Sequence, residues 1–494
     1  MFPTRNGVPP VKLANPISMA SGLYIDGRWL DPEGAGRLEV HDPATGEPVG
    51  HVVSASADMA RAAVGAAARA FPTWSGLAPD ERSQVLRRAY DLVVRRADEL
   101  ARILTLEHGK PVDEARGEVL WGADFLLWYA EEIRRPWGEI LASNGPNQRL
   151  YVRRRPRGVV VCITPWNFPS SMILRKIAPA TAAGNTVVLK PAEQTPISAT
   201  ALFEIFDEAG FPPGVVNLVC GDPVVIGEAL TTAPQVRQIS FTGSVEVGKL
   251  LMERAARTVT KISLELGGHA PAIVFDDADL DVAATKIGFS KFQGGGQSCI
   301  AANRLFVQEA IADDFAGRLA ERAQSLRVGH GLEPGVSVGP LIDAAAVHRV
   351  RAQVVDAVGR GARVLTGGDT PTGLDPQRFF APTILAGVSP AATIAREETF
   401  GPVAPLIPFR TEGDAIRLAN STPYGLAAYV FTRDLGRAHR VSEALDFGMV
   451  AVNDGALGWV QAPFGGIKES GDGREGGRLG LEEYLDVQYI SLNF

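Results

Sequence analysis

Cysteine is scarce in this sequence, with three residues among 494, and only seven histidines are present. Three thiols cannot build the disulfide framework of a small secreted domain, so we expect a reducing, cytoplasmic environment. The histidines are scattered, and no cysteine–histidine group has the spacing of metal ligands, so no metal centre is expected. Residues 1–18 lack the apolar core of a secretory signal because four prolines interrupt them, and we expect an irregular segment there.

Long apolar runs and a surplus of positive charge are also missing. No stretch approaches the roughly 18 apolar residues of a membrane span, so no membrane association is expected. The net charge of −7 disfavours a nucleic-acid surface, which needs a basic face. A composition of 46% hydrophobic and 21% charged residues is typical of globular proteins, and the length predicts two or three domains.

The first third of the chain predicts helices flanked by hairpins. Apolar residues at 3.6-residue spacing predict helices over 56–70, 80–108 and 112–133, with Ser56 as an N-cap and Gly109 as a C-terminal cap. Turn dipeptides between apolar pieces predict hairpins over 23–30 and 138–155.

From residue 158 onward, short β-branched runs alternate with segments of helix length. The strands are apolar on both faces, which predicts a parallel sheet of βαβ units in an α/β protein. The expected strands are 159–163, 186–189, 215–219 and 236–241, and the expected helices are 171–183, 197–209 and 223–232. Ligands bind at the carboxyl ends of such strands. The segments that follow the strands, 164–169, 190–193, 221–222 and 242–244, are therefore candidate binding loops.

None of these strands is followed by the usual Gly-x-Gly-x-x-Gly dinucleotide fingerprint. Residues 243–250 approach a P-loop, but Leu250 has no hydroxyl for Mg²⁺ and Glu246 would repel phosphate. A glycine and a helix N-terminus at Gly243 and Ser244 remain, and that combination suits a pyrophosphate.

A second loop indicates which dinucleotide is expected. Lys190 and Glu193 follow a neighbouring strand and could bind ribose hydroxyls. A carboxylate accepts hydrogen bonds from a ribose 2′-OH and repels a 2′-phosphate, which favours NAD over NADP.

The segment 289–303 carries three consecutive glycines, and Cys299 follows three residues after them. Glycine lets the backbone approach a ligand closely, and a thiol beyond such a run could attack a bound carbonyl. The alternative is a glycine-rich turn before a buried, inert cysteine, because free cysteine is usually a small hydrophobe.

Seven motifs stand in the order typical of the NAD(P)-dependent aldehyde dehydrogenase superfamily, which the sequence resembles from about residue 23 to its C-terminus. They are Pro-Trp-Asn-Phe-Pro (165–169), Lys-Pro-Ala-Glu (190–193), Phe-Thr-Gly-Ser (241–244), Glu-Leu-Gly-Gly (265–268), Gly-Gln-Ser-Cys (296–299), Glu-Thr-Phe-Gly-Pro (398–402) and Pro-Phe-Gly-Gly (463–466). Segments 173–176, 468–477 and 483–485 resemble the succinate-semialdehyde dehydrogenase branch.

The resemblance implies an aldehyde dehydrogenase-like fold with three parts. A Rossmann-type NAD-binding domain would comprise 1–133 and 156–264, and an α/β catalytic domain would comprise 265–478. A β-arm, 134–155 and 479–494, would pair with a second subunit, so a homodimer or homotetramer is expected.

The resemblance also implies the roles of individual residues. Cys299 would be the nucleophile, Glu265 the general base and Asn167 a donor to the oxyanion. Glu397 would bind the nicotinamide ribose. The implied cofactor contacts are Thr164, Pro165, Trp166, Lys190, Glu193, Gly243, Ser244, Gly248, Leu266, Glu397 and Phe400. The implied substrate contacts are Phe168, Arg175, Gln293, Trp459 and Phe464.

The sequence departs from the semialdehyde branch near the substrate. Gln293 stands six residues before the expected nucleophile, where those enzymes usually carry arginine. Their usual serine near the Pro-Phe-Gly-Gly motif is replaced by Gly458 and Trp459. Of the contacts expected to bind a substrate carboxylate, only Arg175 therefore remains. We expect oxidation of a semialdehyde such as succinate semialdehyde, with a bulkier uncharged aldehyde as the alternative. A cofactor-free thiol hydrolase and a silent binding protein are the alternative classes. Ala301 excludes a disulfide switch with a cysteine two residues after the nucleophile.

Overall fold

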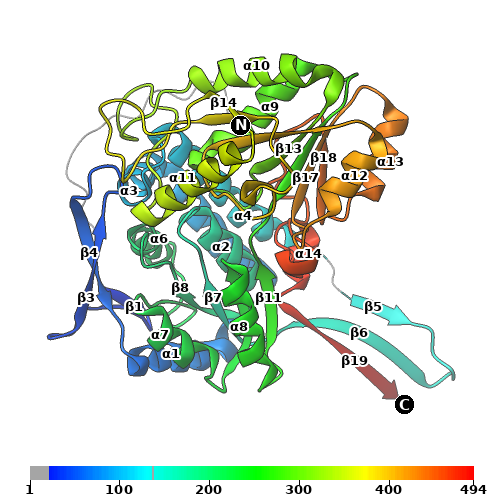
Figure 1. Ribbon diagram of the computed structural model, residues 1–494. Helices are drawn as coiled ribbons and strands as arrows, with labels where there is room; N and C mark the ends of the chain where they lie inside the picture. Colours follow the sequence, from blue (N-terminus) through cyan, green and yellow to red (C-terminus); the bar gives the residue numbers. More distant parts are fainter. Residues whose placement is uncertain (1–21, 136–137) are drawn as a thin grey trace.

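The computed structural model describes residues 22–135 and 138–494, so the expected irregular segment 1–18 lies outside the described residues. Figure 1 shows two α/β lobes and a long β-arm that projects from them, with the C-terminus at the tip of the arm. Each lobe is built on a seven-stranded sheet.

The first sheet is the predicted parallel sheet, extended by a hairpin at one edge. Its order is β11 (Lys261–Glu265), β10 (Val236–Thr242), β7 (Val159–Ile163), β8 (Thr186–Lys190), β9 (Val216–Leu218), β1 (Leu23–Ile25) and β2 (Arg28–Leu30). Strands β7 to β11 pair in parallel, whereas β1 pairs antiparallel with β9 and β2. The β1–β2 turn has Asp26 and Gly27 at φ 54° and 74°, which confirms the predicted hairpin.

Eight helices accompany this sheet in the described part of the chain. They are α1 (Ala57–Gly76), α2 (Pro79–Arg95), α3 (Ala97–His108), α4 (Val112–Glu132), α5 (Ser171–Ala182), α6 (Ile197–Glu208), α7 (Pro223–Thr231) and α8 (Val245–Ala256). A two-stranded sheet of β3 (Gly36–His41) and β4 (Pro48–Ser54) precedes them.

Two helix boundaries differ from the sequence expectation. The predicted helix 80–108 is two helices, because Arg96 leaves helical geometry (φ −95°, ψ 14°) and its guanidinium binds the Glu99 carboxylate at 2.9 Å. Helix α1 continues through Pro72 to Gly76, beyond the predicted end at residue 70. The predicted caps are confirmed: Ser56 Oγ accepts from Met59 N, and Gly109 adopts φ 89°.

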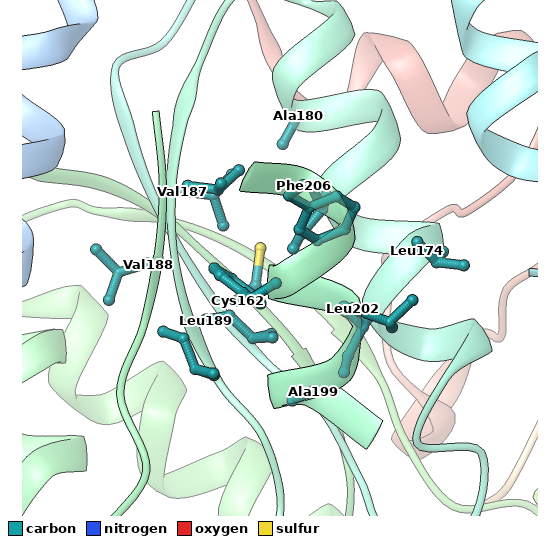
Figure 2. Close-up of a cluster of buried hydrophobic side chains, with 14 of the residues drawn as sticks. Cys162, Leu174, Ala180, Val187, Val188, Leu189, Ala199, Leu202 and Phe206 are labelled. Carbon is teal, nitrogen blue, oxygen red and sulfur yellow. The ribbon is translucent and has the colours of Figure 1, made fainter. Parts of the chain in front are cut away.

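Cys162 lies in the core of the first lobe (Figure 2). Its sulfur is surrounded by apolar side chains of β8, α5 and α6, among them Leu189, Leu202 and Phe206. Cys220 is also buried. Burial raises the pKa of both thiols to about 12, and their enclosure in the core keeps a substrate from reaching either sulfur.

The second sheet forms the other lobe. Its order is β14 (Arg363–Thr366), β15 (Thr383–Ala386), β16 (Val403–Phe409), β13 (Ala302–Gln308), β12 (Ala270–Val274), β17 (Ala427–Phe431) and β18 (Met449–Val452). All neighbours are parallel except β14 and β15. The associated helices are α9 (Leu280–Phe292), α10 (Ala312–Gln324), α11 (Ala344–Gly359), α12 (Glu412–Asn420) and α13 (Leu435–Ala444). Two buried clusters contain side chains of this sheet, so both of its faces are covered.

The arm joins segments from distant parts of the chain. It consists of β5 (Gly138–Leu141), β6 (Gln148–Pro156) and β19 (Leu485–Asn493), in the order β19-β6-β5, and the short helix α14 (Gly477–Glu482) leads into it. Strand β19 pairs antiparallel with the whole of β6, as expected from the resemblance. None of the described helices combines the length and apolarity that a bilayer crossing requires.

Candidate active site

A cleft of about 810 Å³ lies where the strand ends of the first sheet face the loop that carries Cys299. Its wall includes the Pro-Trp-Asn-Phe segment after β7, the Thr-Gly-Ser segment at the end of β10 and the Glu-Leu-Gly segment at the end of β11. Of the four candidate binding loops, 164–169 and 242–244 therefore line this cleft as expected, whereas 190–193 and 221–222 do not.

Cys299 follows a tight turn that only glycine adopts easily. Gly294, Gly295 and Gly296 of η1 (Gln293–Gly296) have φ values of 59°, 66° and 75°. A Cβ on Gly296 would lie 2.2 Å from the carbonyl oxygen of Gly401, so a side chain there has no room. The turn places the thiol in the cleft, where it is partly exposed, unlike the two core thiols.

The surroundings of Cys299 disfavour its thiolate form. Enclosure by the cleft wall, with a smaller contribution from the Glu398 carboxylate, raises the pKa of its thiol to about 12. An attack of this sulfur on a carbonyl would therefore have to include loss of the thiol proton.

Asn167 brings a side-chain amide to the same loop. Its Nδ2 atom donates to the backbone oxygen of Gln297 at 2.9 Å, and Asn167 is buried in the cleft wall. The Gln297 side chain holds the loop in turn, because its amide donates to Gly294 O at 3.0 Å and its oxygen accepts from Ile342 N at 2.9 Å. The predicted oxyanion donor and the predicted nucleophile thus lie on directly connected segments.

Glu265 ends β11 and faces the cleft with no polar partner. It is buried, and neither carboxylate oxygen has a hydrogen-bond partner among the described residues. Burial, followed by repulsion from the Glu475 carboxylate, holds its pKa well above the ordinary value. Once deprotonated, such a carboxylate is a stronger base than a solvated one.

Arg175 lies beneath the cleft among aromatic rings. Its guanidinium is 4.2 Å from the ring centroid of Phe464 and 5.3 Å from that of Trp121. Glu475 binds Arg175 at 3.0 Å and Lys176 at 2.8 Å. The Nε atom of Arg175 is buried and has no hydrogen-bond partner within the described residues. A carboxylate entering the cleft could therefore bind this guanidinium.

The expected ribose contact is displaced by one residue. Glu397 is exposed and does not line the cleft, whereas Glu398 lines it and accepts a hydrogen bond from Gly268 N at 3.0 Å. Burial raises the pKa of Glu398 to about 7. Glu397 still belongs to the turn at η3 (Thr393–Ala395), where its backbone N donates to Thr393 O at 2.9 Å, and Glu398 is the first residue beyond that turn. The expectation for Glu397 is corrected accordingly, and Glu398 takes its place as the candidate.

Most other predicted residues line the same cleft. These are Pro165, Trp166, Phe168, Gly243, Ser244, Leu266, Gln293, Phe400, Trp459 and Phe464. The rings of Trp166 and Phe400 lie 5.5 Å apart at its cofactor side. Trp459 is 44% exposed at the substrate side, where the indole of Trp121 donates to the Gly458 carbonyl oxygen at 2.6 Å.

Four residues that were predicted to contact the cofactor do not line the cleft: Thr164, Lys190, Glu193 and Gly248. Thr164 donates its backbone N–H to the carbonyl oxygen of Lys190 at 3.1 Å, so these two strand ends touch. Lys190 forms an ion pair with Glu193. Gly248 packs on Leu266, and a Cβ there would lie 2.7 Å from the leucine methyl groups. Glycine at 248 therefore lets α8 approach β11.

These residues fit a dinucleotide. The buried hydroxyls of Thr164 and Thr242, at the ends of β7 and β10, have no hydrogen-bond partner in the described part of the chain. Ser244 caps α8 by accepting from Val247 N at 3.3 Å, which confirms the expected helix N-terminus. Unpaired donors and a helix N-terminus suit phosphate and ribose oxygens.

Sequence reasoning missed Glu475, Trp121 and Arg349 as members of the cleft. Glu475 belongs to segment 468–477, which was interpreted only as a sign of the semialdehyde branch. Trp121 lies on the predicted helix 112–133, and helical spacing does not distinguish a core side chain from one that lines a cleft. Arg349 lies on α11 with no local motif. The signal that could have indicated Glu475 was its place in segment 468–477, which resembles the semialdehyde branch.

Comparison with known proteins agrees with this geometry. Residues 29–490 match the aldehyde dehydrogenase family. The chain is 48% identical to a glutarate-semialdehyde dehydrogenase of Pseudomonas putida, over 95% of this chain and 97% of that one. It is 49% identical to an NADP(+) succinate-semialdehyde dehydrogenase of Escherichia coli, over 95% and 97% of the two chains.

Solved structures of aldehyde dehydrogenases are also similar to this chain over most of its length. The crystal structure of a succinate-semialdehyde dehydrogenase from Burkholderia pseudomallei has a TM-score of 0.95 at 47% identity, covering 96% of this chain and 98% of that one. A Staphylococcus aureus betaine aldehyde dehydrogenase in complex with NAD+ has a TM-score of 0.92 at 36% identity, covering 96% and 95%.

Proposed function

This chain belongs to the aldehyde dehydrogenase family, and we propose that it oxidises a carboxylate-bearing semialdehyde, such as succinate semialdehyde, with NAD⁺ as the preferred oxidant. As an NAD(P)-dependent aldehyde dehydrogenase it converts an aldehyde to a carboxylic acid. The identity of the aldehyde, the choice of NAD⁺ and the residue roles described next are the proposal.

The position of Arg175 is the observation that supports a carboxylate-bearing aldehyde as the substrate. Its guanidinium is 1% exposed, borders the cleft that holds Cys299, and keeps an unpaired Nε. A buried arginine is stabilised by planar, bidentate binding of a carboxylate. Glu475 balances part of its charge, and the terminal carboxylate of a semialdehyde would occupy its remaining donors.

The reaction begins with Cys299. Its thiol releases its proton to water, and the sulfur adds to the aldehyde carbon to form a thiohemiacetal, whose oxygen gains negative charge as the C–S bond forms and the C=O π bond breaks. The Asn167 amide and the Cys299 backbone N–H would donate to that oxygen, and one such donor is worth ~2.7–4 kcal/mol. The oxidised nicotinamide, when bound, supplies the acceptor for the hydride that leaves this carbon.

Glu265 completes the reaction. Loss of hydride leaves a thioester on Cys299, and water must attack it to release the acid. The Glu265 carboxylate takes a proton from that water, which its raised pKa favours. Overall, the aldehyde, NAD⁺ and water become the carboxylate, NADH and two protons.

Glu193 supports NAD⁺ over NADP⁺. Its side chain is 30% exposed beside Lys190 at the end of β8, so it is open to a ribose. The carboxylate accepts a hydrogen bond from a 2′-hydroxyl and repels a 2′-phosphate. Glu398, which lines the cleft, would bind the nicotinamide ribose, and Trp166 and Phe400 would pack near the ring.

An uncharged, bulkier aldehyde is the second candidate substrate. Gln293 lines the cleft where a further cation would assist a carboxylate, and the indole of Trp459 provides apolar surface at the same side. These two side chains favour an aromatic or aliphatic aldehyde.

The arm supports a homodimer or homotetramer. Strands β5 and β19 are its unpaired edges, and Ile140, Val487 and Tyr489 expose 79%, 62% and 58% of their surfaces. Exposed apolar edge strands are stabilised by pairing with another chain. We assign this role to 134–155 and 479–494, with 1–133 and 156–264 as the NAD-binding domain and 265–478 as the catalytic domain.

The direct test is the formation of NADH from succinate semialdehyde and NAD⁺, followed by absorbance. Cys299→Ala should abolish it, whereas Cys220→Ala, which removes a core thiol, should retain it. Absence of NADH with any aldehyde from folded wild-type protein would refute the proposal.

A further inference from the structure

A buried ion pair at the start of α4 contacts the segment that carries Asn167. Lys110 Nζ lies 2.6 Å from Glu118 Oε2, and both side chains are fully buried. Removing two charges from water is costly, and the attraction between them offsets that cost only when further hydrogen bonds satisfy both groups. The partners that satisfy this pair therefore indicate its purpose.

Lys110 reaches the backbone of the predicted oxyanion donor. Its ammonium donates to the carbonyl oxygen of Asn167 at 2.9 Å, and it lies 4.3 Å from the centroid of the Phe168 ring. The ammonium thus contacts Glu118, Asn167 and Phe168, and this fixes the peptide plane next to the Asn167 side chain.

Glu118 holds the other end of the same segment. Its Oε1 atom accepts from the backbone N–H groups of Ser170 and Ser171 at 3.0 and 3.1 Å, at the N-terminus of α5. The pair therefore binds residues 167–171 at both ends, one end through the ammonium and the other through the carboxylate.

The same face of α4 also holds the loop that leads to Cys299. Glu114, one turn before Glu118, accepts from Gly294 N at 3.0 Å. Asn167 Nδ2 connects the two segments by donating to Gln297 O at 2.9 Å. One helix thus sets the separation of the two segments that would provide the oxyanion donors.

We propose that Lys110 and Glu118 are positioning residues that hold the Asn167 amide at the oxyanion; this rests on the function proposed above. Neither residue lines the cleft, so both act through Asn167. Displacing a reacting group by about 1 Å costs roughly 100-fold in rate, so the loss of these contacts has a large kinetic effect. If the pair served only to cap α5, the effect of its removal would not depend on the Asn167 side chain.

A double-mutant cycle separates these two roles. The variant K110M/E118Q removes both charges, so no lone charge stays buried, and the amide oxygen introduced at position 118 can still accept from Ser170 and Ser171. We expect it to lower kcat/KM for the aldehyde roughly 10- to 100-fold in the wild-type background. In the N167A background the same change should cost less than about twofold, because the group that it positions is absent.

The controls address stability and cofactor binding. Glu107 is a matched buried carboxylate that accepts from Ile197 N and Ser198 N at the start of α6, and it makes no hydrogen bond to residues 167–171 in the described part of the chain. E107Q should lower the thermal unfolding temperature and leave kcat within about twofold. The KM for NAD⁺ should be unchanged in K110M/E118Q.

If K110M/E118Q does not fold, the conservative variant E118D provides the test in its place. It keeps the charge and withdraws the carboxylate by one methylene, and we expect a smaller loss of kcat/KM that again disappears in the N167A background. An equal loss of kcat/KM in the wild-type and N167A backgrounds would overturn the positioning role of Lys110 and Glu118. No loss of kcat/KM from folded variants would overturn it as well. An inactive wild type would instead refute the proposed function, so the two failures are distinguishable.

Discussion

The side-chain nitrogen of Asn167 lies 2.9 Å from the backbone oxygen of Gln297, two residues before Cys299. This hydrogen bond joins a loop of the first sheet to the loop that carries the thiol, so the two lobes meet at the reacting groups. The amide is held before substrate arrives, and an oxyanion needs donors that are already in position.

Replacing Glu265 by glutamine should separate the two halves of the reaction. Glu265→Gln cannot accept a proton from water, so NADH should appear as a burst of about one equivalent and then continue roughly 100-fold more slowly than in wild type. Stopped-flow absorbance measures both phases. Full steady-state turnover by this variant would assign the base to another group.

The pH dependence of wild-type turnover follows from the raised pKa of Glu265. A raised pKa keeps the carboxyl protonated to a higher pH than an ordinary glutamate, so kcat should rise with pH over a range above the one in which an exposed glutamate titrates. The rise should be absent from the slow phase of Glu265→Gln. A wild-type kcat that falls over this range would contradict the assignment.

Arg175→Met tests the binding of the substrate carboxylate. The variant removes the cation but keeps much of the apolar stem among the rings of Trp121 and Phe464, and Glu475 keeps its bond to Lys176. We expect kcat/KM for succinate semialdehyde to fall about 100-fold and that for butanal to change less than about fivefold, because a charged contact is worth more than a neutral one. Equal losses for both aldehydes would indicate a structural role for Arg175.

Glu193→Ser tests the choice of cofactor. Removing the carboxylate removes repulsion of a 2′-phosphate, so kcat/KM for NADP⁺ should rise roughly tenfold and that for NAD⁺ should fall. The KM for the aldehyde, measured at saturating cofactor, serves as the control. An unchanged ratio between the two cofactors would show that Glu193 does not contact the ribose.

Charges on the arm should dissociate the oligomer. Ile140→Asp with Val487→Asp places carboxylates on exposed apolar positions of β5 and β19, and light scattering should show a smaller assembly than wild type. Leu435→Asp is the matched control, because Leu435 is 74% exposed but lies on α13. Dissociation by the control alone would place the interface elsewhere.

The sequence predicted the elements and residues that depend on local pattern. The parallel strands, the capping roles of Ser56 and Gly109, and the grouping of Cys299, Glu265 and Asn167 in one cleft follow from hydrophobic spacing and ordered motifs. The sequence-based prediction failed where two adjacent residues of the same type could each contact the cofactor. Glu397 and Glu398 are adjacent and chemically identical, and the local sequence pattern does not indicate which of them enters the cleft.

Long-range contacts between side chains outside the ordered motifs could not be predicted from the sequence. Glu475 binds Lys176 across 299 positions, and Glu118 binds Ser170 across 52, yet neither has a local signal of its partner. Buried charges normally require such partners. A buried carboxylate in a helix pattern could therefore have suggested that some contact exists, but not which one.

The most direct test of the central claim compares kcat/KM for succinate semialdehyde and butanal, with NAD⁺ and wild-type protein. The two substrates share a four-carbon chain and differ in the terminal carboxylate that Arg175 would bind. We predict a preference of about 100-fold for succinate semialdehyde, matching the value of a charged contact. An equal or greater kcat/KM for butanal would contradict the account and assign the cleft, through Gln293 and Trp459, to uncharged aldehydes.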